Sequence, residues 1–381
     1  MDFSLSSEQR AMFDTVRAFA LSDVAPLALS WDQNKTFPAD TLRAAAQLGM
    51  GGIYIPEAQG GAGLSRVDAA LLFEALAYGC PSLASFVSIE NLTTGMIAKH
   101  ALPALREKWL AKLISMEAFG SYCLTEPSAG SDAAALATTA KRDGDHYVLN
   151  GSKAFISGGG VADVYVVMCR TGGPGPKGIS AIVVEKGTQG LSFGAQERKM
   201  GWNCQPTAQV NLDNARVPVS NLLGEEGRGF TYAMAGLDSG RLNISAASLG
   251  GAQAALDKAI AYMHERKAFG QRLDQFQALQ FRLADMETKL QAARALLWQA
   301  AWKLENAEPD ATKFCAMAKK FVTDSAFEVA NDALQLHGGY GYLQDFGIEK
   351  IVRDLRVHQI LEGTNEIMRL IVARKMIEGA G

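Results

Sequence analysis

The sequence has few cysteines, no long run of apolar residues and no excess of charge of either sign. Its 5 cysteines are odd in number, widely spaced and never form a C-x-x-C pair, which argues against a disulfide framework and against a thiolate metal site. No stretch approaches the roughly 18 uninterrupted apolar residues of a membrane-spanning helix. The chain has 37 basic and 40 acidic residues, so it lacks the excess of positive charge that is typical of nucleic-acid binding. We therefore expect no membrane insertion, and a small or neutral partner.

The N-terminus lacks the features of a targeting segment. It begins Met1-Asp2-Phe3-Ser4 and carries a second acid at Glu8, whereas a secretory signal begins basic and apolar and a transit peptide avoids acids. The expected location is cytoplasmic, with the cysteines as buried thiols in a reducing compartment.

Common catalytic motifs are also missing. The 5 histidines contain no i, i+4 pair and no H-E-x-x-H motif, so no metal site is expected. There is no G-x-S-x-G motif, although spacing alone leaves a Ser-His-Asp hydrolase open. Gly173–Gly178 matches G-x-G-x-x-G but precedes the strand pattern of residues 179–184 rather than a helix, so we interpret it as a hairpin connection and not as a dinucleotide site.

The length of 381 residues suggests two or three domains, at roughly 150 residues each. Ser6 and Gln9 have the form of a capping box ahead of an amphipathic helix, and helical spacing returns over residues 39–48, 66–78 and 102–114. Residues 1–120 are therefore predicted to form a helical domain.

The pattern changes twice after this domain. Residues 121–226 contain short β-rich runs at 146–149, 164–169, 179–184 and 208–212, which predict a middle domain of antiparallel strands. Residues 227–381 return to long helices, and alternating intervals of three and four predict a packed bundle. These apolar positions are Phe276, Leu279, Leu283, Met286, Leu290, Ala293 and Leu297. The predicted fold class is α+β, and these side chains are interpreted as core.

Two loops combine hydroxyl groups with small residues. Tyr122–Asp132 and Gly151–Gly160 expose backbone amides and short side chains that suit a phosphate or an acceptor-rich ring. Phe155 lies in the second loop and could stack on such a ring. Each loop by itself is also compatible with an ordinary surface connection.

One acid near the C-terminus has an unusual setting. Glu362 lies between apolar Ile360-Leu361 and Gly363. Burial there would raise the pKa of its carboxyl group, as a general base requires. A lone Glu ahead of a helix is also compatible with a simple charge that offsets the helix dipole.

Taken together, five segments resemble the flavin-dependent acyl-CoA dehydrogenases, in order and spacing over nearly the whole chain. The segments are Tyr122–Asp132, Phe155–Ser157, Arg266–Gly270, Gln335–Gly341 and Ile360–Glu366. The resemblance implies an N-terminal helical domain, a middle β domain and a C-terminal four-helix bundle. Within the family the chain most resembles members that oxidise isobutyryl-CoA in valine breakdown, on residues 51–54, 158–160, 168–178 and 201–207.

The resemblance also implies roles for individual residues. Glu362 matches the catalytic base, since Ser239 and Gly240, at the turn where some relatives carry it, cannot abstract a proton. Positions matching contacts to FAD are Tyr122, Cys123, Leu124, Thr125, Ser131, Phe155, Ile156, Ser157, Arg266, Phe276, Gln277, Gln335, Leu336, His337, Gly338, Gly339, Thr364, Asn365 and Glu366. Positions matching substrate contacts are Ser131, Asp238, Ser239, Gly240, Arg241, Gly363 and Arg374. Leu361 and residues 89–92 are candidate walls of the acyl pocket, and core packing is nearly as good an interpretation of both.

The implied chemistry is α,β-dehydrogenation. Glu362 removes a Cα proton while the β-hydrogen passes to the flavin as hydride, and the backbone N–H of Glu362 polarises the thioester carbonyl. The implied partners are the acyl-CoA substrate, an electron-transfer flavoprotein and further copies in a homotetramer. Alternatives are 2-methylbutyryl-CoA or butyryl-CoA as substrate, an oxygen-using oxidase or monooxygenase-like relative, and a non-catalytic scaffold.

Overall fold

The computed structural model describes residues 4–378 and begins with a helical region. Its helices are α1 (Ser7–Phe19), α2 (Ala25–Asn34), α3 (Ala39–Gln47), α4 (Arg66–Ala77), α5 (Pro81–His100) and α6 (Pro103–Ile114). The predicted capping box is present, because Ser6 Oγ accepts from the Gln9 backbone N–H at 3.1 Å and the Gln9 side chain accepts from the Ser6 N–H. Helix α5 was not predicted. It is buried on nearly every side and so lacks the polar face that makes a helix visible in a sequence.

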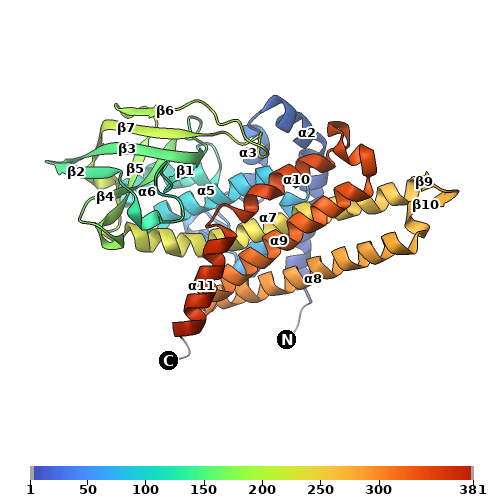
Figure 1. The fold of residues 1–381 in the computed structure, drawn as a ribbon. Coiled ribbons are helices and arrows are strands. Elements are labelled where there is room, and N and C mark those ends of the chain that lie inside the picture. Colours follow the sequence, from blue (N-terminus) through green and yellow to red (C-terminus); the bar gives the residue numbers. More distant parts are fainter. Residues whose placement is uncertain (1–3, 379–381) are drawn as a thin grey trace.

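The middle region is a twisted sheet at one end of the molecule (Figure 1). Its strands are β1 (Gly120–Cys123), β2 (Thr139–Asp143), β3 (His146–Ser157), β4 (Val164–Arg170), β5 (Ile179–Glu185), β6 (Leu191–Phe193), β7 (Thr207–Pro218) and β8 (Leu222–Leu223). The order is β6-β7-β3-β2-β4-β5-β8, with β1 beside β4. Most pairs are antiparallel as predicted, but β1 runs parallel to β4, as does the single β2–β4 pairing. Residues 171–178 join antiparallel β4 and β5, so the glycine-rich segment is a hairpin connection.

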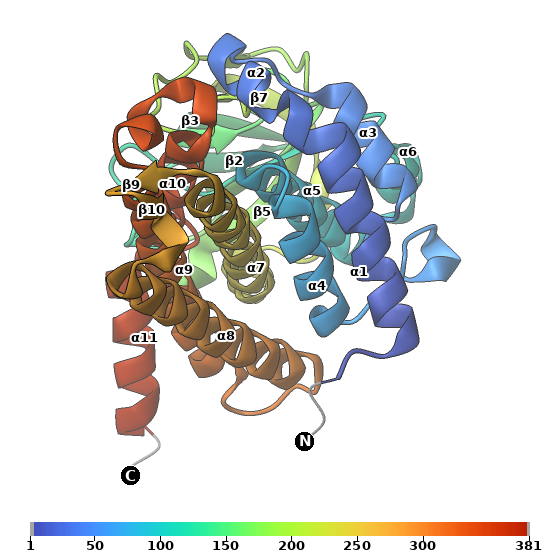
Figure 2. The same ribbon diagram turned by 90° about the vertical axis from the view of Figure 1, so that its right-hand side faces the viewer.

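The C-terminal region returns to long helices. They are α7 (Gly229–Glu265), α8 (Gln277–Glu305), α9 (Ala311–Leu336), α10 (Ile348–Arg356) and α11 (Asn365–Glu378), with a small hairpin of β9 (Lys267–Ala268) and β10 (Gln271–Arg272) between α7 and α8. Helices α7, α8 and α9 pack along one another, and α10 and α11 lie against α9 (Figures 1 and 2). The predicted bundle positions Met286, Leu290, Ala293 and Leu297 of α8 are buried.

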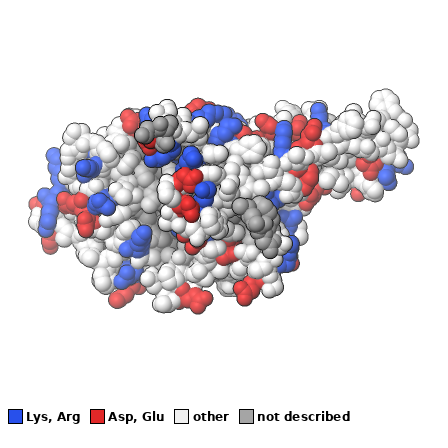
Figure 3. Space-filling model, turned by 90° about the horizontal axis from the view of Figure 1, so that it is seen from below, with Lys and Arg blue, Asp and Glu red and all other residues white. Residues whose placement is uncertain are grey.

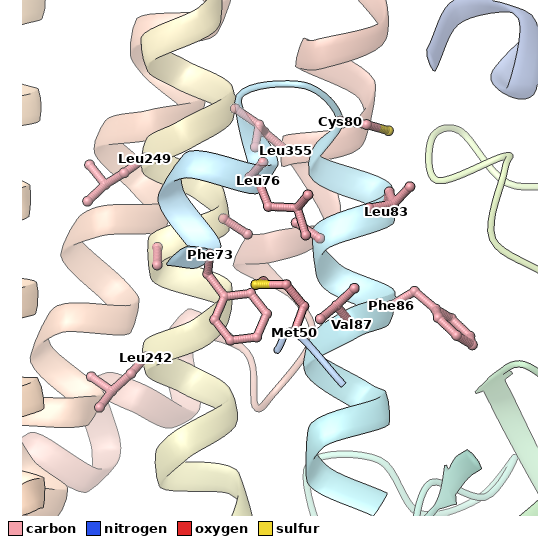
Figure 4. Close-up of a cluster of buried hydrophobic side chains, with 14 of the residues drawn as sticks. Met50, Phe73, Leu76, Cys80, Leu83, Phe86, Val87, Leu242, Leu249 and Leu355 are labelled. Atoms are coloured by element: carbon pink, nitrogen blue, oxygen red, sulfur yellow. The ribbon is translucent and has the colours of Figure 1, made fainter. Parts of the chain in front are cut away.

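The core continues from the N-terminal helices into the bundle. Figure 4 shows part of one cluster of buried apolar side chains to which α4, α5, α7 and α10 contribute, among them Phe73, Leu83, Leu249 and Leu355. Gly250 permits the close approach of α4 to α7, since a Cβ there would lie 2.1 Å from the carbonyl oxygen of Glu74. The helices on which the site is built are therefore fixed to one another by packing.

Acidic and basic side chains are interspersed on the face drawn in Figure 3, in keeping with the lack of a polyanion footprint. Within residues 4–378 we find no cluster of His, Cys, Asp or Glu arranged to hold a metal ion. In the same part of the chain, none of the helices has both the length and the apolar character needed to cross a membrane.

Candidate active site

A cavity of about 350 Å³ lies where the sheet meets α5, α7 and the turn before α11; we call it the reaction cavity. Ten predicted site residues line it: Tyr122, Leu124, Thr125, Ser131, Phe155, Ile156, Ser157, Arg241, Glu362 and Gly363. They come from four separate segments of the chain, and the fold brings them to one place. The volume lies in the usual range for small-molecule sites.

A buried ion pair holds the loop that follows β1. Lys153 of β3 donates from Nζ to the Leu124 carbonyl oxygen at 3.1 Å and to Glu126 Oε1 at 2.8 Å. The Glu126 carboxylate also accepts from the backbone N–H groups of Ala137 and Thr138. Because these bonds satisfy the buried charges and fix the backbone on both sides of Thr125, the loop is pre-organised.

Two of the predicted residues that border the cavity are aromatic, Tyr122 and Phe155. The Tyr122 hydroxyl is buried and has no hydrogen-bond partner among the described residues; burial, together with the nearby Glu362 carboxylate, raises its pKa. Phe155 has a backbone φ of +57° and is 68% exposed. Such a conformation is uncommon for an aromatic residue and clusters at functional sites. Ser157 Oγ accepts from Gln205 Nε2 at 2.9 Å, which fixes its hydroxyl.

Glu362 lies in a left-handed turn. Its φ is +57°, and that of Gly363 is +89°. The Glu362 carbonyl oxygen accepts from Arg241 Nε at 3.2 Å, and the Gly363 carbonyl oxygen accepts from Lys319 Nζ at 2.8 Å. Helices α7 and α9 thus each hold one carbonyl of the turn.

The Glu362 carboxyl group is buried against α7. Its Oε2 has no hydrogen-bond partner among the described residues, and a Cβ at Gly240 would lie 2.7 Å from this atom. Burial raises the pKa of the carboxyl to about 7, and the positive charges of Arg241 and Lys319 oppose the shift. A carboxylate with this pKa suits general base catalysis near neutral pH.

Several predicted residues lie outside the reaction cavity. Cys123 is buried in the core, because adjacent strand residues face opposite sides of a sheet. Asp238 does not line the cavity, since its carboxylate accepts from Arg241 Nη1 and from Thr312 Oγ1, each at 2.7 Å. Asn365 is buried, with its amide bonded to side chains of α9. Thr364, Glu366, Arg374 and Leu361 are likewise absent from its lining; for Leu361 this corrects the prediction of a pocket wall.

Most of the remaining predicted residues line two other cavities. Arg266, Gln335, Leu336, His337, Gly338 and Gly339 line one of about 620 Å³, which we call the distal cavity. It shares no lining residue with the reaction cavity. Phe276 and Gln277 lie at the start of α8 and outside that lining. Ser239 and Gly240 line a third cavity, of about 360 Å³, which also contains Leu92; we call it the α5–α7 cavity.

Sequence reasoning missed part of the apolar lining. Phe230, Met234 and Leu237 line the reaction cavity together with Arg241, as do Ile367 and Ile371 of α11. The signal was available, since residues three or four apart share one face of a helix and Arg241 marks that face of α7. Of the predicted stretch 89–92, Ile89 and Leu92 line the reaction cavity, whereas Glu90 and Asn91 do not.

Comparison with known sequences assigns the chain to a family. The N-terminal, middle and C-terminal domain models of acyl-CoA dehydrogenases match residues 6–117, 121–215 and 227–377. The chain is 53% identical to "Isobutyryl-CoA dehydrogenase, mitochondrial" of Bos taurus and 52% identical to the protein of that name from Dictyostelium discoideum. Each match covers 98% of this chain and 90% of the relative. The chain belongs to the acyl-CoA dehydrogenase family.

Solved structures agree. Butyryl-CoA dehydrogenase from Megasphaera elsdenii matches with a TM-score of 0.95 and 36% identity, over 99% of this chain and 100% of that one. A chain from work on the electron transferring flavoprotein of Acidaminococcus fermentans matches with a TM-score of 0.93 and 40% identity, over 99% of each chain. PigA with FAD and proline matches with a TM-score of 0.95 and 29% identity, over 99% of each chain. The predicted fold is confirmed, and the family implies a flavin cofactor and an acyl-CoA substrate.

Proposed function

We propose that this protein is an FAD-dependent dehydrogenase that oxidises isobutyryl-CoA between Cα and Cβ to methacrylyl-CoA, with Glu362 as the base. The observation that carries the proposal is the buried, unpartnered Glu362 carboxyl in a cavity lined by the two predicted loops. The identity to two isobutyryl-CoA dehydrogenases supports the choice of substrate. Because one methylene is worth only about 1–3 kcal/mol of discrimination, 2-methylbutyryl-CoA and butyryl-CoA are the second candidates.

The residues present fit a flavin. Tyr122 contributes a buried hydroxyl without a protein partner, and Thr125, Ser131 and Ser157 add hydroxyl groups to the lining of the same cavity. These donors suit a ring rich in acceptors, and Phe155 supplies an aromatic surface beside them. When bound, FAD accepts the β-hydrogen as hydride.

Glu362 performs the proton transfer. Its carboxylate takes the Cα proton, and desolvation of the carboxyl supplies the basicity that an exposed Glu lacks. The backbone N–H of Glu362 polarises the thioester carbonyl, which acidifies the Cα proton. The apolar side chains of α7 and α11 exclude water, so these interactions act at a low dielectric constant.

We infer that a second copy of the chain completes the cofactor site, within a homotetramer. Arg266 and Gln335–Gly339 match family contacts to the FAD pyrophosphate and adenosine, yet they line the distal cavity rather than the reaction cavity. Phe269, Phe281 and Tyr342 are 97%, 61% and 84% exposed, and contact with a second copy would remove their apolar surface from water. An electron-transfer flavoprotein is the proposed acceptor, in keeping with the solved relative from such a system. A cytoplasmic location stays a prediction.

The test is anaerobic titration of the purified flavoprotein with isobutyryl-CoA, butyryl-CoA and isovaleryl-CoA while flavin bleaching is followed. We expect Glu362→Gln to bind flavin and ligand but to lose reduction, and Glu328→Gln, an exposed acid on α9 paired with Lys289, to behave as wild type. Undiminished bleaching in Glu362→Gln would assign the base elsewhere. Rapid re-oxidation of reduced enzyme by air would favour the oxidase, and a colourless protein that takes up no FAD would favour the scaffold.

A further inference from the structure

Lys319 is a buried lysine that none of the sequence motifs includes. It lies on α9, is fully buried, and donates from Nζ to the Gly363 carbonyl oxygen and to Asn365 Oδ1, each at 2.8 Å. Both acceptors are neutral. A lysine that gives up its hydration to bind a turn next to a proposed catalytic residue calls for an explanation, because burial of a cation is costly.

The turn that Lys319 binds is strained and clamped from two sides. Glu362 and Gly363 both have positive φ, and a non-glycine residue in this conformation costs about 1–3 kcal/mol unless its surroundings enforce it. Arg241 of α7 bonds the first carbonyl and Lys319 of α9 bonds the second. Both cations bind turn carbonyls, and Oε2 of the carboxylate keeps no hydrogen-bond partner among the described residues.

The two cations differ in how their charge is balanced. Arg241 pairs with Asp238 through Nη1 at 2.7 Å, so most of its charge is offset on α7 itself. Among residues 4–378, no carboxylate lies within ion-pair distance of Lys319 Nζ, whose hydrogen bonds go to a carbonyl and an amide oxygen. Of the two cations near Glu362, Lys319 is therefore the one whose positive charge is less offset by a neighbouring carboxylate.

The other charged and titratable groups around this pair come from several elements. They are Tyr122 on β1, Asp238 and Arg241 on α7, Asp324 on α9, His358 in the turn after α10, and Glu366 on α11. Burial and the nearby Lys319 lower the pKa of His358 to about 3, so this ring is neutral. Asp324 and Glu366 oppose the fall in the pKa of Lys319 that burial causes.

We propose that Lys319 is a positioning residue for proton abstraction: it holds the Glu362–Gly363 turn from the α9 side, and its charge, together with that of Arg241, lowers the pH at which the Glu362 carboxylate becomes ionised. The inference rests on the proposed function, because it presumes that Glu362 is the base. In support, the pKa of Lys319 falls to about 7 through burial, while the Glu362 carboxylate opposes the fall. The two groups thus favour each other's charged forms.

The experiment measures the rate of flavin reduction by isobutyryl-CoA from pH 5.5 to 9 in anaerobic stopped flow. Lys319→Met removes the charge and the donor, whereas Lys319→Gln removes only the charge. Since a nearby opposite charge lowers a carboxyl pKa by about 1–3 units, we expect the midpoint of the pH profile to rise by about one unit in both variants. We expect Lys319→Gln to be faster than Lys319→Met at high pH, because an amide can still donate to the Gly363 carbonyl.

The control is Lys320→Met, the adjacent and partly exposed lysine, which pairs with Asp324 at 3.2 Å; its midpoint should match wild type. Lys319 variants that bind flavin and keep the wild-type midpoint would overturn the inference. So would failure of both variants to fold when Lys320→Met folds, since Lys319 would then be only part of the core. If Glu362→Gln still reduces its flavin, the base assignment itself fails, which is a separate result.

Discussion

The Glu362 carboxyl group lies against the backbone of Gly240 on α7. A Cβ at residue 240 would lie 2.7 Å from Oε2 and 2.9 Å from Oε1, closer than side chains pack. The absence of a side chain at this position therefore makes room for the proposed base. The atoms that would clash are the far end of a flexible side chain rather than backbone, so a methyl group would move the carboxylate and leave the helix intact.

We predict that Gly240→Ala separates activity from stability. Alanine is favoured over glycine in a helix interior by about 1 kcal/mol, so the free energy of unfolding should stay unchanged or rise by up to that amount. Flavin reduction should slow by about 100-fold, because a shift of about 1 Å in a reacting group has effects of that size. Chemical unfolding and single-turnover reduction measure the two quantities.

The matched control for this substitution is Ser239→Ala, at the preceding residue of α7. Ser239 lines the α5–α7 cavity and not the reaction cavity, so its loss should slow reduction far less than Gly240→Ala does. A Gly240→Ala enzyme with the wild-type rate would mean that the carboxylate does not need this position.

The pKa of Glu362 also predicts how stability depends on pH. Burial raises this pKa from 4.5 to about 7, so between these values the folded state holds a proton that the unfolded state has lost. Stability therefore falls as pH rises through this window. Glu362→Gln cannot titrate, and we expect it to exceed wild type in stability by about 1–3 kcal/mol at pH 8, with little difference at pH 4.5. Urea unfolding of both proteins at these two pH values measures the effect, and an equal difference at both would contradict it.

The sequence was most informative where the pattern is local. The capping box at Ser6 and the strand before Gly173 depend on neighbouring residues, and each was predicted. The burial of α5 and the parallel pairing of β1 depend on distant parts of the chain, so no local pattern reports them. The same holds within the site: the motif around Glu362 was visible, whereas the contact of Lys319 joins residues 44 positions apart.

Leu92 of α5 separates two of the cavities. It lines both the reaction cavity and the α5–α7 cavity. Its Cδ1 lies against α7 so closely that a Cβ at Gly236 would be 2.4 Å away. The side chain thus lies between the reaction cavity and the α5–α7 cavity.

We predict that Leu92→Ala joins the two cavities and extends the range of substrates. Each methylene that gains an apolar environment contributes about 0.8 kcal/mol, so two further methylenes are worth about tenfold. The ratio of kcat/KM for hexanoyl-CoA to that for isobutyryl-CoA should rise by about this factor. Ile89→Ala is the control, since Ile89 lines only the reaction cavity and its truncation leaves the partition in place. If both variants change the ratio equally, added volume near the base is the cause, and Leu92 does not limit chain length.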